Sequence, residues 1–352
     1  MNKNIHICHR PYQILRSCDL IHRNKKNDDY NILISYDVKL MNENKYQRFE
    51  TNEIFYDMFD EVIFLQRSIV PSTRDFINYI NYFKTLQEYY KPYIDKLKDV
   101  ENLYFYSDLE QDIVYFVDMF KKAVKQSSNI ILVDEGLATY ERVKTVTWKG
   151  ILYMYLFSRV VGFRNYNYRR IYGFSGLYNK SLANVPERAN FRKPVDKLQP
   201  ISEDLCRELM KKANFDVVGD KVFVFISSYT IPYETEIPVL KEIISVLEKY
   251  GYTCLLKLHP LQNEFLYKSK FGNVRFLPKG YPVEMFFNKN MKIGGSGSSA
   301  LFNALLQGCA AVDLTHLFGD DAIGIVRDFP WIKLPVVDSF EEFETYLKKN
   351  KQ

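Results

Sequence analysis

Three short polar motifs, far apart in the chain, each follow an apolar run that predicts a buried strand. They are Asp134-Glu135-Gly136 after residues 129–133, His259-Pro260 after residues 252–258, and Ser298-Ser299 after residues 291–297. Open parallel sheets present reactive groups at the carboxyl ends of their strands. A carboxylate, an imidazole and a phosphate cradle are together what an enzyme needs to join an alcohol to an activated sugar.

The acidic motif offers a general base. Gly136 permits a tight turn, which leaves a carboxylate at the end of the strand. A hydroxyl nucleophile loses its proton as it attacks, and Asp134 can accept that proton. The same pattern also fits an ordinary turn acid or a helix N-cap.

The imidazole motif offers a proton donor. Pro260 cannot continue a strand in the ladder, so His259 is expected at the rim of the sheet, with a titration range suited to proton donation near neutrality. Lys257 can add positive charge near a phosphate. The alternatives are a structural histidine and a solvated lysine.

The third motif offers an anion site. Residues 294–299 hold three Gly and three Ser, including Gly297, and run from a predicted strand into a predicted helix. Helix N-terminal N–H groups and two hydroxyls can bind a phosphate there. A plain Ser N-cap is the alternative, and a Walker A loop is excluded because no Gly-Lys-Ser/Thr follows.

Other residues at strand ends extend these sites. Glu284 can accept hydrogen bonds from both hydroxyls of a ribose, as acidic residues do in dinucleotide folds, or it is an ordinary first-turn helix acid. Ser227 and Ser228 end the first strand of the second half and can meet a nucleotide. The weaker candidates for contact with an acceptor molecule are Glu135, Gly136, His9, Arg10 and Gln13.

Composition restricts the class of protein. The chain has 352 residues, 47% of them hydrophobic and 26% charged, which indicates a globular protein of two domains. A net charge of +5 suits an anionic substrate but is too small to argue for nucleic acid. The five cysteines form no CxxC pair and are expected to be buried in a reducing compartment. Because no cluster has metal-ligand spacing, we expect no metal and no other cofactor.

The predicted elements alternate strand and helix twice. This alternation favours parallel sheets, and we expect an α/β, GT-B-like fold in which two Rossmann-like, doubly wound domains face a central cleft. The N-terminal domain is expected over 1–190, a linker over 191–203, and the C-terminal domain over 204–352. In the first half, Pro92 is expected to end or kink the helix predicted from about residue 74 to 97, and residues 171–177 are a weak strand candidate.

Taken together, the motifs resemble those of bacterial GT-B sialyltransferases, most closely glycosyltransferase family 52 and the related capsular polysialyltransferases. These families carry a D/E-D/E-G motif, an HP motif and an S-S/T motif in this order, and the opening ICHRPYQIL and the Pro-Val-Glu ending at Glu284 match further family positions. The resemblance spans nearly the whole chain.

The resemblance implies an inverting, metal-independent transfer of sialic acid from CMP-sialic acid to a sugar hydroxyl, of galactose or of sialic acid, on a bacterial surface glycan such as a capsule polysaccharide or lipooligosaccharide. It implies that Asp134 deprotonates the acceptor, His259 protonates or hydrogen-bonds the departing phosphate, Ser298 and Ser299 hold that phosphate, and Glu284 binds the ribose. The alternatives are a hexosyltransferase that uses a UDP-sugar and a non-catalytic nucleotide- or glycan-binding subunit of capsule assembly.

The expected partners are a nucleotide-sugar donor and a glycan acceptor, which lipid linkage would place at a membrane. The first residues show no signal-peptide pattern and the longest apolar run, Ile151–Phe163, is too short to span a bilayer, so we expect a cytoplasmic protein. That run, followed by Arg164, Arg169 and Arg170, leaves open peripheral contact with the inner face of the cell membrane. A homodimer is also left open.

Overall fold

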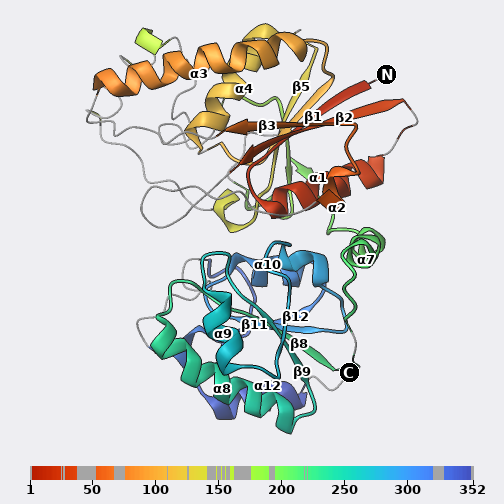
Figure 1. Cartoon of the computed structure of the whole chain (residues 1–352), viewed down its shortest axis with the longest axis vertical. Coiled ribbons are helices and arrows are strands. Elements are labelled where there is room, and N and C mark those ends of the chain that lie inside the picture. The colour runs from red at the N-terminus through yellow and green to blue at the C-terminus, as the bar shows by residue number, and fades with distance from the viewer. Residues whose placement is uncertain are drawn as a thin grey trace. The chain divides into compact units, whose positions relative to one another are not determined.

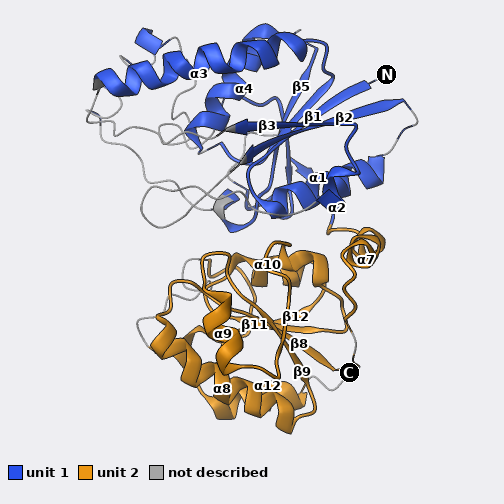
Figure 2. Ribbon diagram, in the orientation of Figure 1, with its two compact units in different colours: residues 1–39, 46–49, 53–199 blue, residues 40–45, 50–52, 200–352 orange. Residues whose placement is uncertain are grey.

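The computed structural model of the protein describes residues 2–37, 53–66, 76–140, 176–189, 195–319 and 329–349. Within these ranges residues 25, 27, 109, 125, 126, 218 and 220 are not described. Of residues 141–175 only 148, 152, 155 and 159–161 are described. The chain divides into two compact units, and the division falls between Gln199 and Pro200 (Figure 2). Each unit is described by itself.

Unit 1 is built on seven parallel strands in the order β3-β2-β1-β4-β5-β6-β7 (Figure 1). Apolar runs form the central strands, because the strands of a parallel sheet are covered on both faces. The strands are β1 (Asn2–Cys8), β2 (Asp29–Asp37), β3 (Glu61–Gln66), β4 (Asn102–Phe105), β5 (Asn129–Val133), β6 (Lys180–Ala183) and β7 (Asp196–Lys197).

Helices cover both faces of this sheet. Figure 1 shows α3 and α4 on one face and α1 on the other, and the side chains of α3 and α4 form one buried cluster with those of the strands. The helices are α1 (Pro11–Asn24), α2 (Glu53–Tyr56), α3 (Phe76–Lys96), α4 (Gln111–Ala123) and the 3-10 turn η1 (Leu137–Thr139). Helix α3 continues through Pro92, so the expectation that this residue ends the helix is wrong; Tyr90 and Ile94, buried on either side, hold that turn against the core.

Unit 2 repeats the plan with five parallel strands in the order β10-β9-β8-β11-β12. The strands are β8 (Val222–Ile226), β9 (Thr253–Lys257), β10 (Arg275–Phe276), β11 (Lys292–Gly295) and β12 (Ala310–Asp313). The helices are α7 (Glu203–Lys212), α8 (Tyr233–Lys249), α9 (Glu264–Lys270), α10 (Ser299–Leu306), α12 (Phe340–Lys349) and the 3-10 turns η2 (Val283–Phe286) and η3 (Thr315–Phe318). Figure 1 shows α8 and α12 on one side of this sheet and α10 on the other.

In both sheets the order in which successive strands are added reverses beside the first strand. The reversal falls between β1 and β4 in unit 1 and between β8 and β11 in unit 2. Such a reversal opens a crevice at the carboxyl ends of the strands, where ligands bind in doubly wound folds. In unit 2, β11 approaches β8 closely, because a Cβ at Gly294 would lie 2.4 Å from the ring of Phe223 and one at Gly295 would lie 2.6 Å from the carbonyl oxygen of Ile226. The predicted α/β fold with two Rossmann-like units is thus confirmed.

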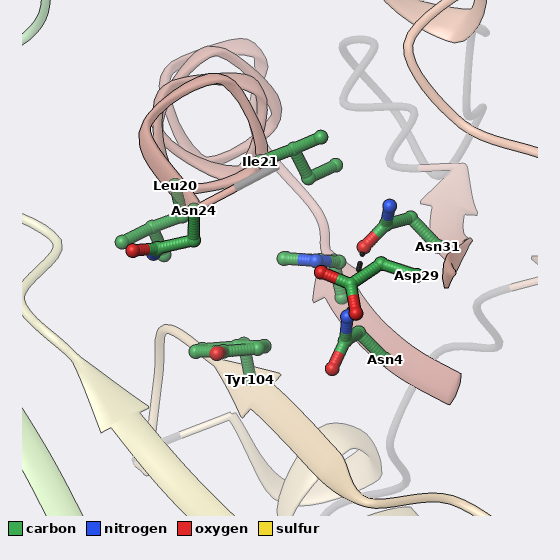
Figure 3. Close-up of a pocket in the computed structure, with 8 residues that line it drawn as sticks. Asn4, Leu20, Ile21, Asn24, Asp29, Asn31 and Tyr104 are labelled. Carbon is green, nitrogen blue, oxygen red and sulfur yellow. Dashed lines mark hydrogen bonds between the residues drawn. The ribbon is translucent and has the colours of Figure 1, made fainter. Parts of the chain in front are cut away.

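The amino-terminal ends of the strands of unit 1 carry a chain of asparagines. Asn129 donates to Asn102 at 2.8 Å, Asn102 to Asn4 at 2.9 Å, and Asn4 to Asn31 at 3.1 Å, one residue on each of four neighbouring strands. Beside them a cavity of about 20 Å³, large enough for water, is lined by Asn4, Asp29, Asn31, Tyr104 and others (Figure 3).

His6 also lines this cavity, and its ring stacks on Tyr104 at a centroid distance of 4.7 Å. Among the described residues, neither ring nitrogen has a partner within hydrogen-bonding geometry, although Asn31 lies near enough to favour the imidazolium. Burial outweighs that effect and lowers the pKa of His6 to about 3.

Some predictions concern residues outside this description. Most of the strand candidate 171–177 and all of the basic segment 164–170 lie outside the described residues. Residues Asp196–Lys197, within the expected linker, form β7 and pair with β6. All five cysteines are described; they are buried and none of them forms a disulfide.

Candidate active site

A cavity of about 800 Å³ opens in unit 2 at the reversal between β8 and β11. This volume is in the range of small-molecule and cofactor sites. The predicted catalytic residue His259 lines it, together with five of the residues predicted to bind the donor: Ser227, Ser228, Gly297, Ser298 and Ser299. They come from the ends of three strands and the start of α10, as expected for parallel strands that end at one edge.

The start of α10 is arranged to receive an anion. Ser298 is the N-cap, and its side-chain oxygen accepts from the Ala300 N–H at 3.3 Å, so the hydroxyl proton remains available to a ligand. Gly297 has φ of 59°, a left-handed conformation, and its N–H donates to the Thr315 hydroxyl at 3.0 Å. Ser299, the first helical residue, is exposed. The helix dipole and two hydroxyls therefore converge on one side of the cavity.

The imidazole of His259 has a defined proton position. Its Nδ1 accepts from the Leu261 N–H at 3.2 Å, so the neutral ring carries its proton on Nε2. Burial, with added effects of the cations Lys279 and Lys257, lowers the pKa of His259 to about 4. The ring is thus neutral near pH 7, so the expected titration near neutrality is wrong, and Nε2–H is available to the cavity as a hydrogen-bond donor. The Tyr229 ring lies beside it, with a centroid distance of 4.4 Å.

Three residues predicted to bind the donor do not line this cavity. Lys257 is buried, and its Nζ donates to the carbonyls of Pro278 at 2.6 Å, Lys279 at 3.1 Å and Tyr281 at 2.6 Å. Its three N–H groups are therefore engaged in holding the 278–281 loop, and burial lowers the pKa of Lys257 to about 7. Pro260 is exposed at the end of β9.

Glu284 is buried in η2 and accepts from the Asn303 side chain at 2.8 Å. Its charge favours the protonated form of Lys257. Because Asn303 belongs to α10, Glu284 is tied to the helix that begins at the anion site.

In unit 1, Asp134 follows β5 and is completely buried. One carboxylate oxygen accepts from the Gly136 N–H at 2.7 Å, and Gly136 has φ of 111°, which favours glycine. The other oxygen accepts from the Asn184 N–H at 3.0 Å, from the Asn184 side chain at 2.8 Å, and from the Tyr140 hydroxyl. Four donors thus converge on this carboxylate, and burial together with Asp134 raises the pKa of Tyr140.

The weaker acceptor candidates lie together at the same edge of the sheet. The Gln13 side chain accepts from the His9 N–H at 2.8 Å and donates to the Glu135 carboxylate at 3.0 Å. Glu135 is half-buried and Arg10 is exposed. Glu110, which sequence reasoning missed, lies 3.9 Å from the imidazole of His9 and 3.8 Å from the guanidinium of Arg10.

Other residues of these sites were also missed. Arg16 is buried in α1, where its charge is felt by Asp134, and it donates to the Gln199 carbonyl at 2.7 Å. Tyr140, Asn184 and Thr315 carry no motif that would have marked them. Among the residues that the structure describes, no three His, Cys, Asp or Glu side chains converge as a metal site, and the absence of a metal requirement stays a prediction.

The two parallel α/β sheets, each with a reversal in its strand order, give the chain the two-unit, Rossmann-like architecture of the GT-B fold. The family model described as alpha-2,8-polysialyltransferase (POLYST) matches residues 4–310. The chain therefore belongs to the alpha-2,8-polysialyltransferase family, and it is a glycosyltransferase of the sialyltransferase type. No curated protein matches the chain in sequence.

Solved structures share the fold. An alpha/beta-galactoside alpha-2,3-sialyltransferase from Photobacterium phosphoreum matches with a TM-score of 0.54 and 12% identity, covering 95% of this chain and 98% of that one. A sialyltransferase from Photobacterium damsela matches with a TM-score of 0.52 and 12% identity, covering 96% and 81%. A UDP-GlcNAc 2-epimerase from Neisseria meningitidis, bound to UDP-GlcNAc, matches with a TM-score of 0.53 and 12% identity, covering 98% and 93%.

No helix within the described ranges is both long enough and apolar enough to cross a bilayer.

Proposed function

We propose that the protein transfers sialic acid from CMP-sialic acid to a sugar hydroxyl of a bacterial surface glycan, with inversion at the anomeric carbon. The observation that carries the proposal is the cavity of unit 2, where the Nε2–H of His259, the N-terminus of α10 and the hydroxyls of Ser298 and Ser299 meet. Such preorganised donors stabilise a phosphate that gains negative charge as it leaves. Family membership supports sialic acid as the group transferred.

In the proposed reaction, the acceptor oxygen bonds to the anomeric carbon while the bond from that carbon to the phosphate oxygen of CMP breaks. The electron pair of the broken bond goes to the phosphate, which His259, Ser298 and Ser299 stabilise. The acceptor proton goes to a carboxylate of unit 1. No metal is required in this scheme, because protein donors supply the positive potential.

Asp134 is our proposed base, and its burial sets a condition. Four donors occupy its two oxygens and it exposes no surface, so a proton reaches it only after one of these donors gives way. Glu135, half-buried beside Gln13, is the other acid within the motif. Asp134→Asn and Glu135→Gln, compared in one transfer assay, separate the two: loss of transfer only in Glu135→Gln would move the role to Glu135.

A hexosyltransferase that uses a UDP-sugar is the second candidate, because the fold of an epimerase bound to UDP-GlcNAc is as similar to this chain as those of the sialyltransferases. Thermal stabilisation by CMP and by UDP at equal concentrations discriminates the two. We expect CMP to raise the melting temperature more. A larger rise with UDP would favour the hexosyltransferase, and nucleotide binding without turnover would favour a non-catalytic subunit.

We also propose contact with an anionic membrane, where a lipid-linked acceptor would lie. Residues 148, 152, 155 and 159–161 are helical, and Trp148, Leu152, Tyr155 and Val160 are 69%, 51%, 51% and 57% exposed. Arg159 lies over the Tyr155 ring at 4.8 Å. Exposed aromatic, aliphatic and basic side chains that lie close together in the sequence suit a bilayer interface.

Flotation with vesicles that contain anionic phospholipid tests this contact. The double variant Trp148→Ser/Leu152→Ser should lose vesicle binding, whereas Phe265→Ser, which removes a 78% exposed aromatic from unit 2, should bind as the wild type does. If the wild-type protein fails to float at low salt, membrane contact is excluded.

A further inference from the structure

Gln262 holds the backbone of the histidine motif. Its side-chain oxygen accepts from the His259 N–H at 2.8 Å, and its own N–H donates to the His259 carbonyl at 3.0 Å. The turn closed in this way brings the Leu261 N–H to Nδ1 of the imidazole. The backbone that fixes the ring is thus fastened by the side chain of one buried residue.

The amide of Gln262 is itself oriented by a buried carboxylate. Its nitrogen lies 3.0 Å from Glu236, 2.6 Å from the Ser227 hydroxyl and 2.8 Å from the Tyr267 hydroxyl. Glu236 is completely buried and also accepts from the Ser227 hydroxyl at 2.5 Å and from the Tyr267 hydroxyl.

The backbone N–H of His259 can only donate, so the amide of Gln262 presents its oxygen to His259 and its N–H₂ group to Glu236. Ser227 lies at the end of β8 and Glu236 in the first turn of α8. Gln262 lies in the turn after β9, and Tyr267 belongs to α9. The turn is therefore anchored to three elements of unit 2.

We propose that Gln262, oriented by Glu236, is a positioning residue that fixes the tautomer and direction of the His259 ring, so that Nε2–H faces the phosphate of the donor. The identity of the ligand rests on the proposed function, whereas the state of the ring does not. In the described part of the chain Nε2 has no protein partner. Loss of Gln262 would free the turn, and the Leu261 N–H would no longer select the Nε2–H form.

The state of the ring is measured by long-range ¹H–¹⁵N NMR of the protein labelled at histidine. The chain has five histidines, so His259→Ala assigns the signal. In the wild-type protein at pH 7 we expect a neutral ring with the proton on Nε2. In Gln262→Leu we expect averaged nitrogen shifts from two tautomers. An unchanged Nε2–H pattern in Gln262→Leu would overturn the proposal, whatever reaction the protein catalyses.

A double-mutant cycle tests the effect on transfer. Gln262→Leu should lower kcat about 10- to 100-fold, part of the contribution expected of a preorganised hydrogen-bond donor to the leaving phosphate. Because Gln262 acts through His259, adding Gln262→Leu to His259→Ala should change kcat less than about twofold. Gln87→Leu on the exposed face of α3 is the matched control and should leave kcat unchanged. An equal loss in both backgrounds would show a structural effect and contradict the proposal.

If Gln262→Leu folds poorly, Glu236→Gln provides the second variant. It keeps the shape of Glu236 but presents an amide, which lets the Gln262 amide turn over. The same averaged ring signal is expected. A wild-type protein that does not turn over CMP-sialic acid but shows the NMR result would refute the proposed function alone.

Discussion

Asp134→Asn perturbs a completely buried carboxylate of unit 1 that accepts four hydrogen bonds. The oxygen that faces Tyr140 and Asn184 receives three donors, so it must remain an oxygen, and the new amide nitrogen must face the Gly136 N–H. The new amide N–H₂ group and the Gly136 N–H are then two donors that face each other, and a buried donor left without an acceptor costs about 1–3 kcal/mol. The other three bonds also lose the strength that a charged acceptor gives. We expect a total loss of about 2–4 kcal/mol in the free energy of unfolding.

In a unit of this size each 1 kcal/mol shifts the melting temperature by about 2–4 °C, so the variant should melt about 4–16 °C lower. Calorimetric melting measures the shift, and the transfer assay belongs at a temperature at which the variant is folded. There, transfer should be abolished while CMP affinity stays within about threefold, because the nucleotide cavity is in unit 2. A melting temperature within 1 °C of wild type would refute the described bonding. Retained turnover, or lost CMP binding, would refute the assigned role.

Two further predictions concern His6 and Glu284. Burial holds the folded pKa of His6 at about 3, below its unfolded value near 6.5, so as the pH falls between those values the unfolded state binds the proton and the free energy of unfolding falls by about 1.4 kcal/mol for each pH unit. Urea unfolding from pH 7 to 5 should show this loss in the wild type and in the exposed-site control His22→Asn but not in His6→Asn, and an equal loss in all three would contradict it. Glu284→Ala removes the bond that ties Glu284 to Asn303 of α10, the helix that begins at the anion site, so it should weaken CMP binding by about 1–3 kcal/mol in calorimetry, and unchanged affinity would remove Glu284 from the donor site.

The strands near the centre of each sheet could be predicted because a strand covered on both faces is a continuous apolar run. Polar or short elements carried no such signal: Lys180–Ala183 and Asp196–Lys197 became strands only by pairing with neighbours. Pro92 breaks a helix by local rules, but tertiary packing of α3 overrides that preference.

The candidate site was predictable where a residue ends a strand, because topology alone brings such ends together. His259, Ser227 and Ser298 therefore line one cavity. What each side chain does there depends on partners that spacing does not reveal. Lys257 also ends a strand, β9, yet its N–H groups donate to backbone carbonyls of a loop more than twenty residues later in the chain. Gln262 stands only three residues after His259, and that spacing was its one available signal.

The central claim is that this chain moves sialic acid from a CMP-activated donor by using the cavity of unit 2. Incubation with CMP-sialic acid and a panel of galactosides and oligosialic acids, followed by mass spectrometry of the products, tests it directly. We predict acceptors heavier by one or more sialic acid residues, release of CMP, and a loss of about a hundredfold or more in His259→Ala with an unchanged circular dichroism spectrum. Near wild-type transfer by His259→Ala, or sugar transfer only from a UDP-sugar, would contradict the account.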